Sequence, residues 1–354
     1  MKTIPKSILF LVFAVCLICT QGLGAWIIKV GDQEYATREF QDYINLLRAQ
    51  GGSEQVKLAL RDVEDLNIFL QQFIDRKAVL YAASKAGYTK KNEGLNKAWE
   101  QQKEQLFLQF FLTWQIQQVI GTPQVKEEDL KGFYTRDISK GQGKPWEALA
   151  DQEKLQVQQA YMQMRMKKDY QDRLEKKYKV TRSPKNDDFY VAQVEGTKIK
   201  LSEIDDTVGQ ELAARGVSKD VVAKQNPAML DQFRKEIRET RILLNLVKTE
   251  MANLKFTSSP TGVLAEAFLW ESFLLDRYLD GEFKSKIQVS DKERDEEFNR
   301  NKEQLKNQPY DQVKNTLETF IRERKFQQRY PVFVSEKKEE IQVRRNRDEL
   351  SKIQ

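Results

Sequence analysis

The sequence predicts a mostly α-helical fold made of two tandem modules, each a small β-hairpin followed by long helices. The first observation is composition: glycine and proline are scarce, with 16 and 8 residues, while 32% of the 354 residues are charged and 40% are apolar. Such a composition is typical of amphipathic helices around real cores. The second observation is that the pattern of residues 26–44 returns at residues 189–208. A chain of this length usually forms two or three domains, so the returning pattern predicts two modules.

The returning pattern predicts a hairpin that leads directly into a helix. In each copy an apolar run meets a two-residue turn that contains glycine, at residues 31–32 and again at residues 195–196, as tight hairpins require. A short second strand follows. Thr37 in the first copy and Ser202 in the second then stand where the N-cap of a helix belongs,.

Apolar residues at helical spacing predict further helices after the first hairpin, and glycines stand where two of them end. The predicted elements are helices at residues 39–49, 62–85, 91–120, 125–134 and 146–177, and a strand-like tail at 178–181,. Gly87 and the Gly-Thr-Pro sequence at 121–123 are signals for helix termination. Residues 182–188, with the sequence RSPKNDD, predict a linker,.

The second half of the chain repeats the first at an offset of 164 residues, which indicates an internal repeat. Equivalent positions keep their physical character, as in the pairs Val30 and Val194, Phe40 and Ile204, Phe69 and Phe233, Trp114 and Tyr278, Tyr134 and Phe298, and Trp146 and Tyr310. The predicted organisation is therefore a leader at residues 1–24, a first module at 25–183 and a second module at 184–354.

Residues 1–24 have the pattern of a secretory signal peptide. Two lysines precede an uninterrupted apolar core at residues 8–19, and small residues suitable for cleavage follow near residues 22–24,. The prediction is export to the periplasm or envelope, with no integral membrane span after cleavage. An uncleaved anchor and a lipid attached at Cys19 are the alternatives. The apolar core is shorter than the roughly 20 residues of a spanning helix, and Cys19 lacks the small preceding residue of a typical lipobox.

The residue types that are missing exclude many kinds of chemistry. Histidine is absent, and both cysteines, Cys16 and Cys19, lie in the leader. The mature chain thus lacks the commonest general base and every thiol, so we predict no enzyme activity, no catalytic residue, no metal site and no cofactor. The net charge is +6, or +4 for the mature chain with 57 basic and 53 acidic residues. Acids and bases alternate along the helices without a basic stripe, so nucleic acid is not a predicted partner.

The ordered motifs of the first half resemble the peptide-binding module of SurA-type periplasmic chaperones, which is related to the C-terminal part of trigger factor. The motifs are the hairpin and helix VGDQEYATREFQDYI, the helix LQQFIDRKAVLYAASKAGYT and the later segment VKEEDLKGFYTR. Matching residues are Phe73, Ile74, Asp75, Val79, Leu80, Ala83 and Gly87, and later Val125, Asp129, Leu130, Phe133 and Tyr134. The Asn-Gly turn of the family is replaced at 31–32 and 195–196, and no parvulin-type prolyl isomerase insert is present.

The resemblance implies two SurA N-terminal-like modules in an ATP-independent chaperone without isomerase activity. Its partners would be unfolded or extended polypeptides from outer-membrane or secreted client proteins. Because such a protein needs exposed apolar surface, the candidate peptide-binding residues are Phe107, Phe110, Phe111, Trp114, Trp146, Trp270, Phe273, Leu274, Tyr278 and Tyr310.

Ordinary packing is the alternative role for these ten side chains. Trp146 and Tyr310 in particular stand where hydrophobic staples at helix starts are found. The alternative function is a structural or adhesive envelope protein that retains the chaperone fold. A concave, apolar-lined cleft between long helices distinguishes a chaperone from such a scaffold. The sequence leaves both a monomer and a homodimer open.

Overall fold

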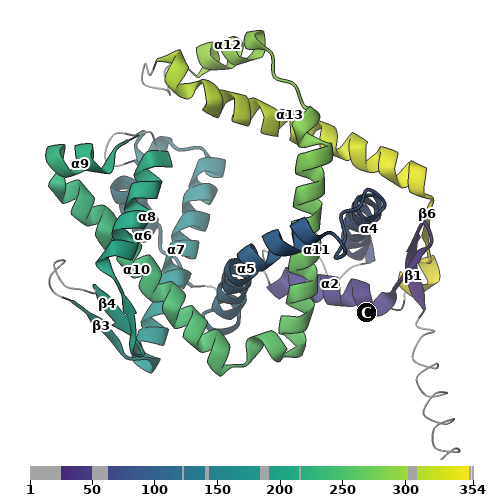
Figure 1. Cartoon of the computed structure of the whole chain (residues 1–354), viewed down its shortest axis with the longest axis horizontal. Helices are drawn as coiled ribbons and strands as arrows, with labels where there is room; N and C mark the ends of the chain where they lie inside the picture. The colour runs from purple at the N-terminus through teal and green to yellow at the C-terminus, as the bar shows by residue number, and fades with distance from the viewer. Residues whose placement is uncertain are drawn as a thin grey trace, which may run out of the picture. The chain divides into compact units, whose positions relative to one another are not determined.

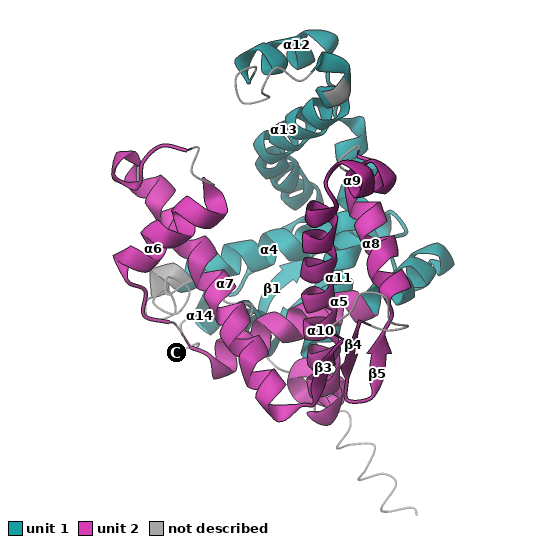
Figure 2. Ribbon diagram, turned by 90° about the vertical axis from the view of Figure 1, so that its left-hand side faces the viewer, with its two compact units in different colours: residues 1–48, 52–103, 264–354 teal, residues 49–51, 104–263 magenta. Residues whose placement is uncertain are grey.

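A computed structural model describes residues 25–49, 63–121, 123–139, 143–183, 191–214, 217–301, 309–350 and 352 (Figure 1). The described chain is mostly helical with small antiparallel sheets, which confirms the mostly α fold class. It divides into two compact units (Figure 2). Unit 1 comprises residues 1–48, 52–103 and 264–354, and unit 2 comprises residues 49–51 and 104–263. The predicted signal peptide lies outside the described residues.

Helices and strands follow one another in the same order in the two halves of the chain. The first half contains β1 (Trp26–Val30), β2 (Gln33–Ala36), α2 (Thr37–Ala49), α4 (Val63–Lys85), α5 (Glu93–Val119), α6 (Glu127–Phe133), the π-helical turn η1 (Tyr134–Ile138), the 3-10 turn η2 (Trp146–Ala148), α7 (Asp151–Lys177) and β3 (Val180–Arg182). The second half contains β4 (Ala192–Val194), β5 (Thr197–Ile199), α8 (Leu201–Ala214), α9 (Lys219–Gln225), α10 (Pro227–Asn253), η3 (Phe256–Ser258), α11 (Pro260–Glu282), η4 (Lys284–Lys286), α12 (Asp291–Arg300), α13 (Tyr310–Ile341), β6 (Val343–Arg345) and α14 (Arg347–Leu350). Helices α8, α10 and α12 each begin 164 residues after α2, α4 and α6.

Each sheet takes its strands from both halves of the chain. The sheet of unit 1 has the order β2-β1-β6, and the sheet of unit 2 has the order β3-β4-β5. All pairings are antiparallel: Ile28 lies opposite Tyr35 and Arg345, and Gln193 lies opposite Thr181 and Lys198. The strand that ends each half therefore completes the hairpin of the other half. The boundary between the predicted modules 25–183 and 184–354 lies inside unit 2. The two compact units are therefore not the two successive halves of the chain.

Both hairpins turn through residues with positive φ, as two-residue turns require. Gly31 has φ 59°, and Glu195 and Gly196 have φ 45° and 87°. A Cβ atom at position 31 would also lie 2.5 Å from the ring of Tyr81. Glycine at this position thus permits both the turn and the close packing of the hairpin on α4.

Two buried clusters form the core of unit 1 among its described residues. One joins the first hairpin to α2 and α4 around Phe40 and Phe73, whose ring centroids lie 5.5 Å apart. The other joins the end of α4 to α11 and α13, and it includes Val79, Tyr278 and Phe326. Burying these apolar side chains holds segments from both ends of the chain in one unit.

The core of unit 2 is centred on α10, which packs against α7, α8 and the sheet. A smaller buried cluster joins α6, η2 and α7, and its members are Leu130, Phe133, Tyr134, Trp146, Leu149, Val157 and Tyr161. The predicted helix at 146–177 is wrong at its start. Leu149 and Ala150 have extended backbone conformations, and α7 begins only at Asp151, where the Glu153 carboxylate accepts a hydrogen bond from the Ala150 N–H at 2.8 Å.

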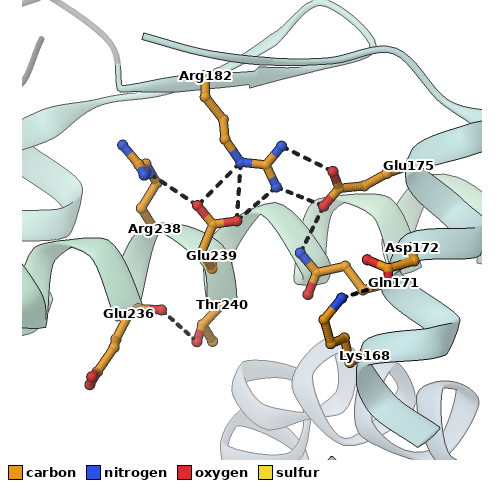
Figure 3. A network of polar contacts seen from close by, with 9 residues as sticks. All are labelled: Lys168, Gln171, Asp172, Glu175, Arg182, Glu236, Arg238, Glu239 and Thr240. Carbon is orange, nitrogen blue, oxygen red and sulfur yellow. Dashed lines mark hydrogen bonds and ion pairs between the residues drawn. The ribbon is translucent and has the colours of Figure 1, made fainter. Parts of the chain in front are cut away.

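The predicted linker at 182–188 is wrong at its first residue, because Arg182 belongs to β3, and Ser183 directly follows the strand. Ser183 N–H donates to the Val191 carbonyl at 2.9 Å. Figure 3 shows the Arg182 guanidinium between Glu175 on α7 and Glu239 on α10, with shortest N···O distances of 2.7 Å to each carboxylate. Hydrogen bonds from Arg182 lower the pKa of Glu175. Residues 184–190 lie outside the described part of the chain.

Candidate functional site

The structure buries eight of the ten predicted peptide-binding residues inside the two units. Phe107, Phe110 and Phe111 are buried in unit 2. Phe111 meets Phe256 with ring centroids 4.9 Å apart, and half-buried Trp114 lies over the same ring at 4.8 Å. Phe110, Phe111 and Trp114 thus form core packing around Phe256 of η3. A client could reach the buried ones only if the helices separated locally.

The predicted residues of α11 are likewise packed in unit 1. Trp270 and Phe273 both contact Trp99, at centroid distances of 5.4 and 5.6 Å. Tyr278 packs edge-to-face on Tyr88 at 5.4 Å, and Leu274 is buried as well. Trp99, which the sequence prediction did not include, completes this aromatic cluster.

Trp146 and Tyr310 occupy equivalent places before α7 and at the start of α13. Trp146 is buried, and its indole N–H donates to Glu127 at 3.2 Å. Half-buried Tyr310 contacts Phe298 at 5.3 Å. Each aromatic ring fixes the start of a long helix against the short helix before it, the packing role that the sequence left as an alternative.

The candidate site is instead a groove in unit 1 between α11 and α13, which are green and yellow in Figure 1. Its volume is about 560 Å³. The apolar part of its lining consists of Leu279 from α11 and of Phe326 and Tyr330 from α13. Leu279 and Phe326 are buried and Tyr330 is half-buried. The two aromatic rings lie 5.3 Å apart, so they form a continuous apolar floor.

Charged side chains surround this floor. Lys284 lies 4.4 Å above the centroid of the Phe326 ring and contacts Glu323 at 3.3 Å and Asp280 at 3.7 Å. A hydrogen bond from Gln327, at 2.7 Å, and the nearby Lys284 lower the pKa of Glu323. Desolvation, together with the neighbouring Asp280 carboxylate, raises the pKa of Asp276. The groove combines apolar contact area with walls of both charge signs.

A second cavity, of about 600 Å³, lies in unit 2 beside α6 and α7. Its lining mixes four polar side chains with Pro123, Val125 and Tyr161. The groove between α11 and α13 differs in that two neighbouring aromatic rings, those of Phe326 and Tyr330, line it, whereas Tyr161 is the aromatic residue of the second cavity. We therefore take the groove as the site.

No family model, curated protein sequence or solved structure matches the chain. Among the described residues, no group of three or more acidic side chains is placed to hold a metal ion. Within the same ranges, no helix combines the length and the apolar character that crossing a bilayer requires.

The sequence prediction missed the groove because it followed the most apolar helices. The signal was weaker but present: Phe326 and Tyr330 are spaced four residues apart on α13, whose other residues are largely charged or polar. Apolar residues at this spacing share one face of a helix. The sequence does not specify how fully a neighbouring helix covers that face.

Proposed function

We propose that the mature chain is an ATP-independent periplasmic chaperone that binds non-native polypeptides from outer-membrane or secreted proteins. The observation that carries this proposal is the groove between α11 and α13, with its apolar floor and charged walls. A concave site between long helices that includes an apolar floor favours a chaperone over a scaffold or adhesin. Residues 1–24, with their signal-peptide pattern, support the location,.

The repeated order of elements supports a duplicated SurA-like module. Each half contains, in order, a hairpin, a helix, two long helices, a short helix, a further long helix and a strand, and the described part of the second half also includes the short helices α9 and α14. The resemblance seen in the motifs of the first half extends by this order to the second. The chain in this proposal is a chaperone module used twice, without an isomerase domain.

Binding in the groove would depend chiefly on burying client side chains on half-buried Tyr330, beside the small exposed parts of Leu279 and Phe326. Burial of apolar surface is non-directional, so it suits clients of diverse sequence. The charged walls keep the empty groove hydrated and limit self-association. The outer strands of the two sheets, β2 and β6 in unit 1 and β3 and β5 in unit 2, offer backbone groups that could pair with an extended client,.

The test is suppression of aggregation by mature protein without nucleotide. Chemically denatured citrate synthase is diluted into buffer with a several-fold molar excess of residues 25–354, and light scattering is followed. We expect scattering to fall strongly compared with an equal amount of an inert protein. Unchanged scattering would remove the main support for the chaperone proposal and favour the scaffold alternative.

A matched pair of variants tests the groove itself. Gln327 lines the groove and Gln328 does not, although both are exposed on α13. In Gln327→Trp the indole fills the groove, so suppression of aggregation should drop several-fold, while Gln328→Trp should keep the original activity. Equal activity of the two variants would place client binding elsewhere. A prolyl isomerisation assay on a proline peptide should give the uncatalysed rate for all three proteins.

A further inference from the structure

A smaller pocket in unit 1 has a composition unlike that of the groove. It lies between α2, α4 and α11 and has a volume of about 120 Å³, which is room for one side chain. Its apolar wall includes three aromatic rings, those of Tyr43, Phe73 and Phe268. Tyr43 lies 5.3 Å from Phe73 and 6.3 Å from Phe268 by ring centroids. Aromatic faces of this kind attract cations as well as apolar groups.

Lys77, which lines this pocket, and Arg76 beside it are both already paired with the Glu271 carboxylate. Buried Lys77 contacts Glu271 at 2.6 Å. Arg76 lies 4.3 Å from the centroid of Phe268 and donates to the Phe268 carbonyl, to Ser272 and to Glu271. Glu271 is thus neutralised within the pocket, and the two cations are held in place.

Two further carboxylates on α2 line the pocket. Glu39 is exposed and accepts a hydrogen bond from the Ala36 N–H at 3.0 Å, which uses one of its oxygens. Asp42 is half-buried and meets Arg38 only at 4.0 Å, the outer limit of an ion pair. Both side chains keep capacity to accept hydrogen bonds from a ligand. With Glu271 paired to Lys77, these two acids give the pocket lining a net negative charge.

We propose that this pocket binds the side chain of one lysine or arginine in a client polypeptide. The apolar stem would lie against the rings of Tyr43 and Phe268, and the charged head would bond to Asp42 and Glu39. This inference rests on the proposed function and specifies the client: a non-native segment that carries a basic residue beside apolar ones. Because the mature chain has a net charge of +4, its overall field opposes cationic peptides, so any preference for them must be local,.

The experiment compares fluorescein-labelled decapeptides of alanine, valine and glycine that differ at one central position. The central residue is lysine, arginine, norleucine or glutamate, and binding to residues 25–354 is measured by fluorescence anisotropy. We expect the lysine and arginine peptides to bind about fivefold more tightly than the norleucine peptide, and the glutamate peptide to bind most weakly. The preference should shrink in 1 M salt.

Variants of the protein then test whether the preference for lysine and arginine peptides arises in this pocket. Asp42→Asn should abolish the preference for lysine over norleucine and leave norleucine binding unchanged. Asp220→Asn, an exposed position on α9 in unit 2, is the charge-matched control and should keep the preference. Ala267→Phe places a ring at the exposed edge of the pocket on α11. It should weaken the binding of the lysine and arginine peptides and leave the binding of the other peptides unchanged. Circular dichroism melts identify any variant that fails to fold.

Equal affinity for lysine and norleucine would overturn the proposal, because an apolar side chain would then be an equally good occupant. A lysine preference that survives both Asp42→Asn and Ala267→Phe would overturn it too. If the protein suppresses aggregation but shows no lysine preference, the chaperone function stands and the pocket assignment fails. If it neither suppresses aggregation nor binds any peptide, both fail.

Discussion

Trp146 packs edge-to-face on Tyr134, with ring centroids 6.0 Å apart and planes at 60°. The residues 164 positions later, Tyr310 and Phe298, make the same kind of contact at 5.3 Å and 88°. The first contact ties η2, the turn before α7, to η1, and the second ties the start of α13 to α12. Two equivalent pairs with the same packing agree with the repeated order of elements along the chain.

We predict that Trp146→Ala lowers the free energy of unfolding by about 3 kcal/mol, because it removes a buried ring and leaves a cavity. Tyr310→Ala should cost less, about 1–2 kcal/mol, since Tyr310 is only half-buried,. Urea unfolding followed by circular dichroism measures both values. Unchanged stability of Trp146→Ala combined with loss of client binding would assign the indole to the client instead.

Arg182→Ala should destabilise unit 2 by about 1 kcal/mol. The guanidinium joins Glu175 on α7 to Glu239 on α10, but its side chain is 34% exposed, so solvent screening limits the contribution,. Arg173→Ala is the matched control, because Arg173 is an exposed arginine on α7, the helix that carries Glu175. Hydrogen exchange of β3 and α10 should rise in the first variant and stay constant in the second. Equal exchange in the two variants would show that the network adds no stability.

Acidic pH should loosen α12 from α13. Lys325 and the N–H and hydroxyl of Ser290 lower the pKa of Glu293 to about 2. Burial raises the pKa of Glu297, but hydrogen bonds from Arg324 and Asn301 outweigh that effect and leave it below its usual value. Carboxylates with lowered pKa values stabilise the fold above about pH 4.5, and this stability is lost as pH falls toward 2.

Thermal unfolding at pH 7 and pH 3 tests this prediction. The double variant Glu293→Gln, Glu297→Gln should be less stable than the original protein at pH 7 and should lose less stability on acidification. Glu339→Gln changes an exposed carboxylate of α13 and should behave like the original. An acid sensitivity identical in all three proteins would rule out these two groups as its source.

A chain cut between its halves should remain assembled. Cleavage at a protease site introduced between residues 186 and 187 breaks the chain between β3 and β4. Because β3 pairs with β4 and β6 pairs with β1, each sheet should still hold strands from both fragments together. Size-exclusion chromatography after cleavage should show one species with the mass of the whole chain. Two separate fragments under native conditions would mean that the pairing between halves is too weak to hold them.

Features that depend on neighbours in sequence could be predicted, and features that depend on distant contacts could not. Gly87 and Gly121 adopt positive φ at the ends of α4 and α5, as their positions after apolar helices predicted. The pairing of β6 with β1 was not predicted, because β6 has the sequence VRR, too short and too charged to show strand alternation,. The candidate residues were chosen because they are apolar. Apolar side chains are also the ones that pack into a core, and eight of the ten are buried.

Strand β3 pairs with the hairpin of the second half, and β6 pairs with the hairpin of the first half. These pairings limit the order in which the protein can finish folding. Unit 2 has all of its segments once residue 263 has emerged, whereas β1 must wait for β6, which ends at Arg345. Closing so long a loop is entropically costly and slow. The first strand of the chain is therefore among the last to gain its second neighbour, and until then its free edge is open to mispairing and proteolysis.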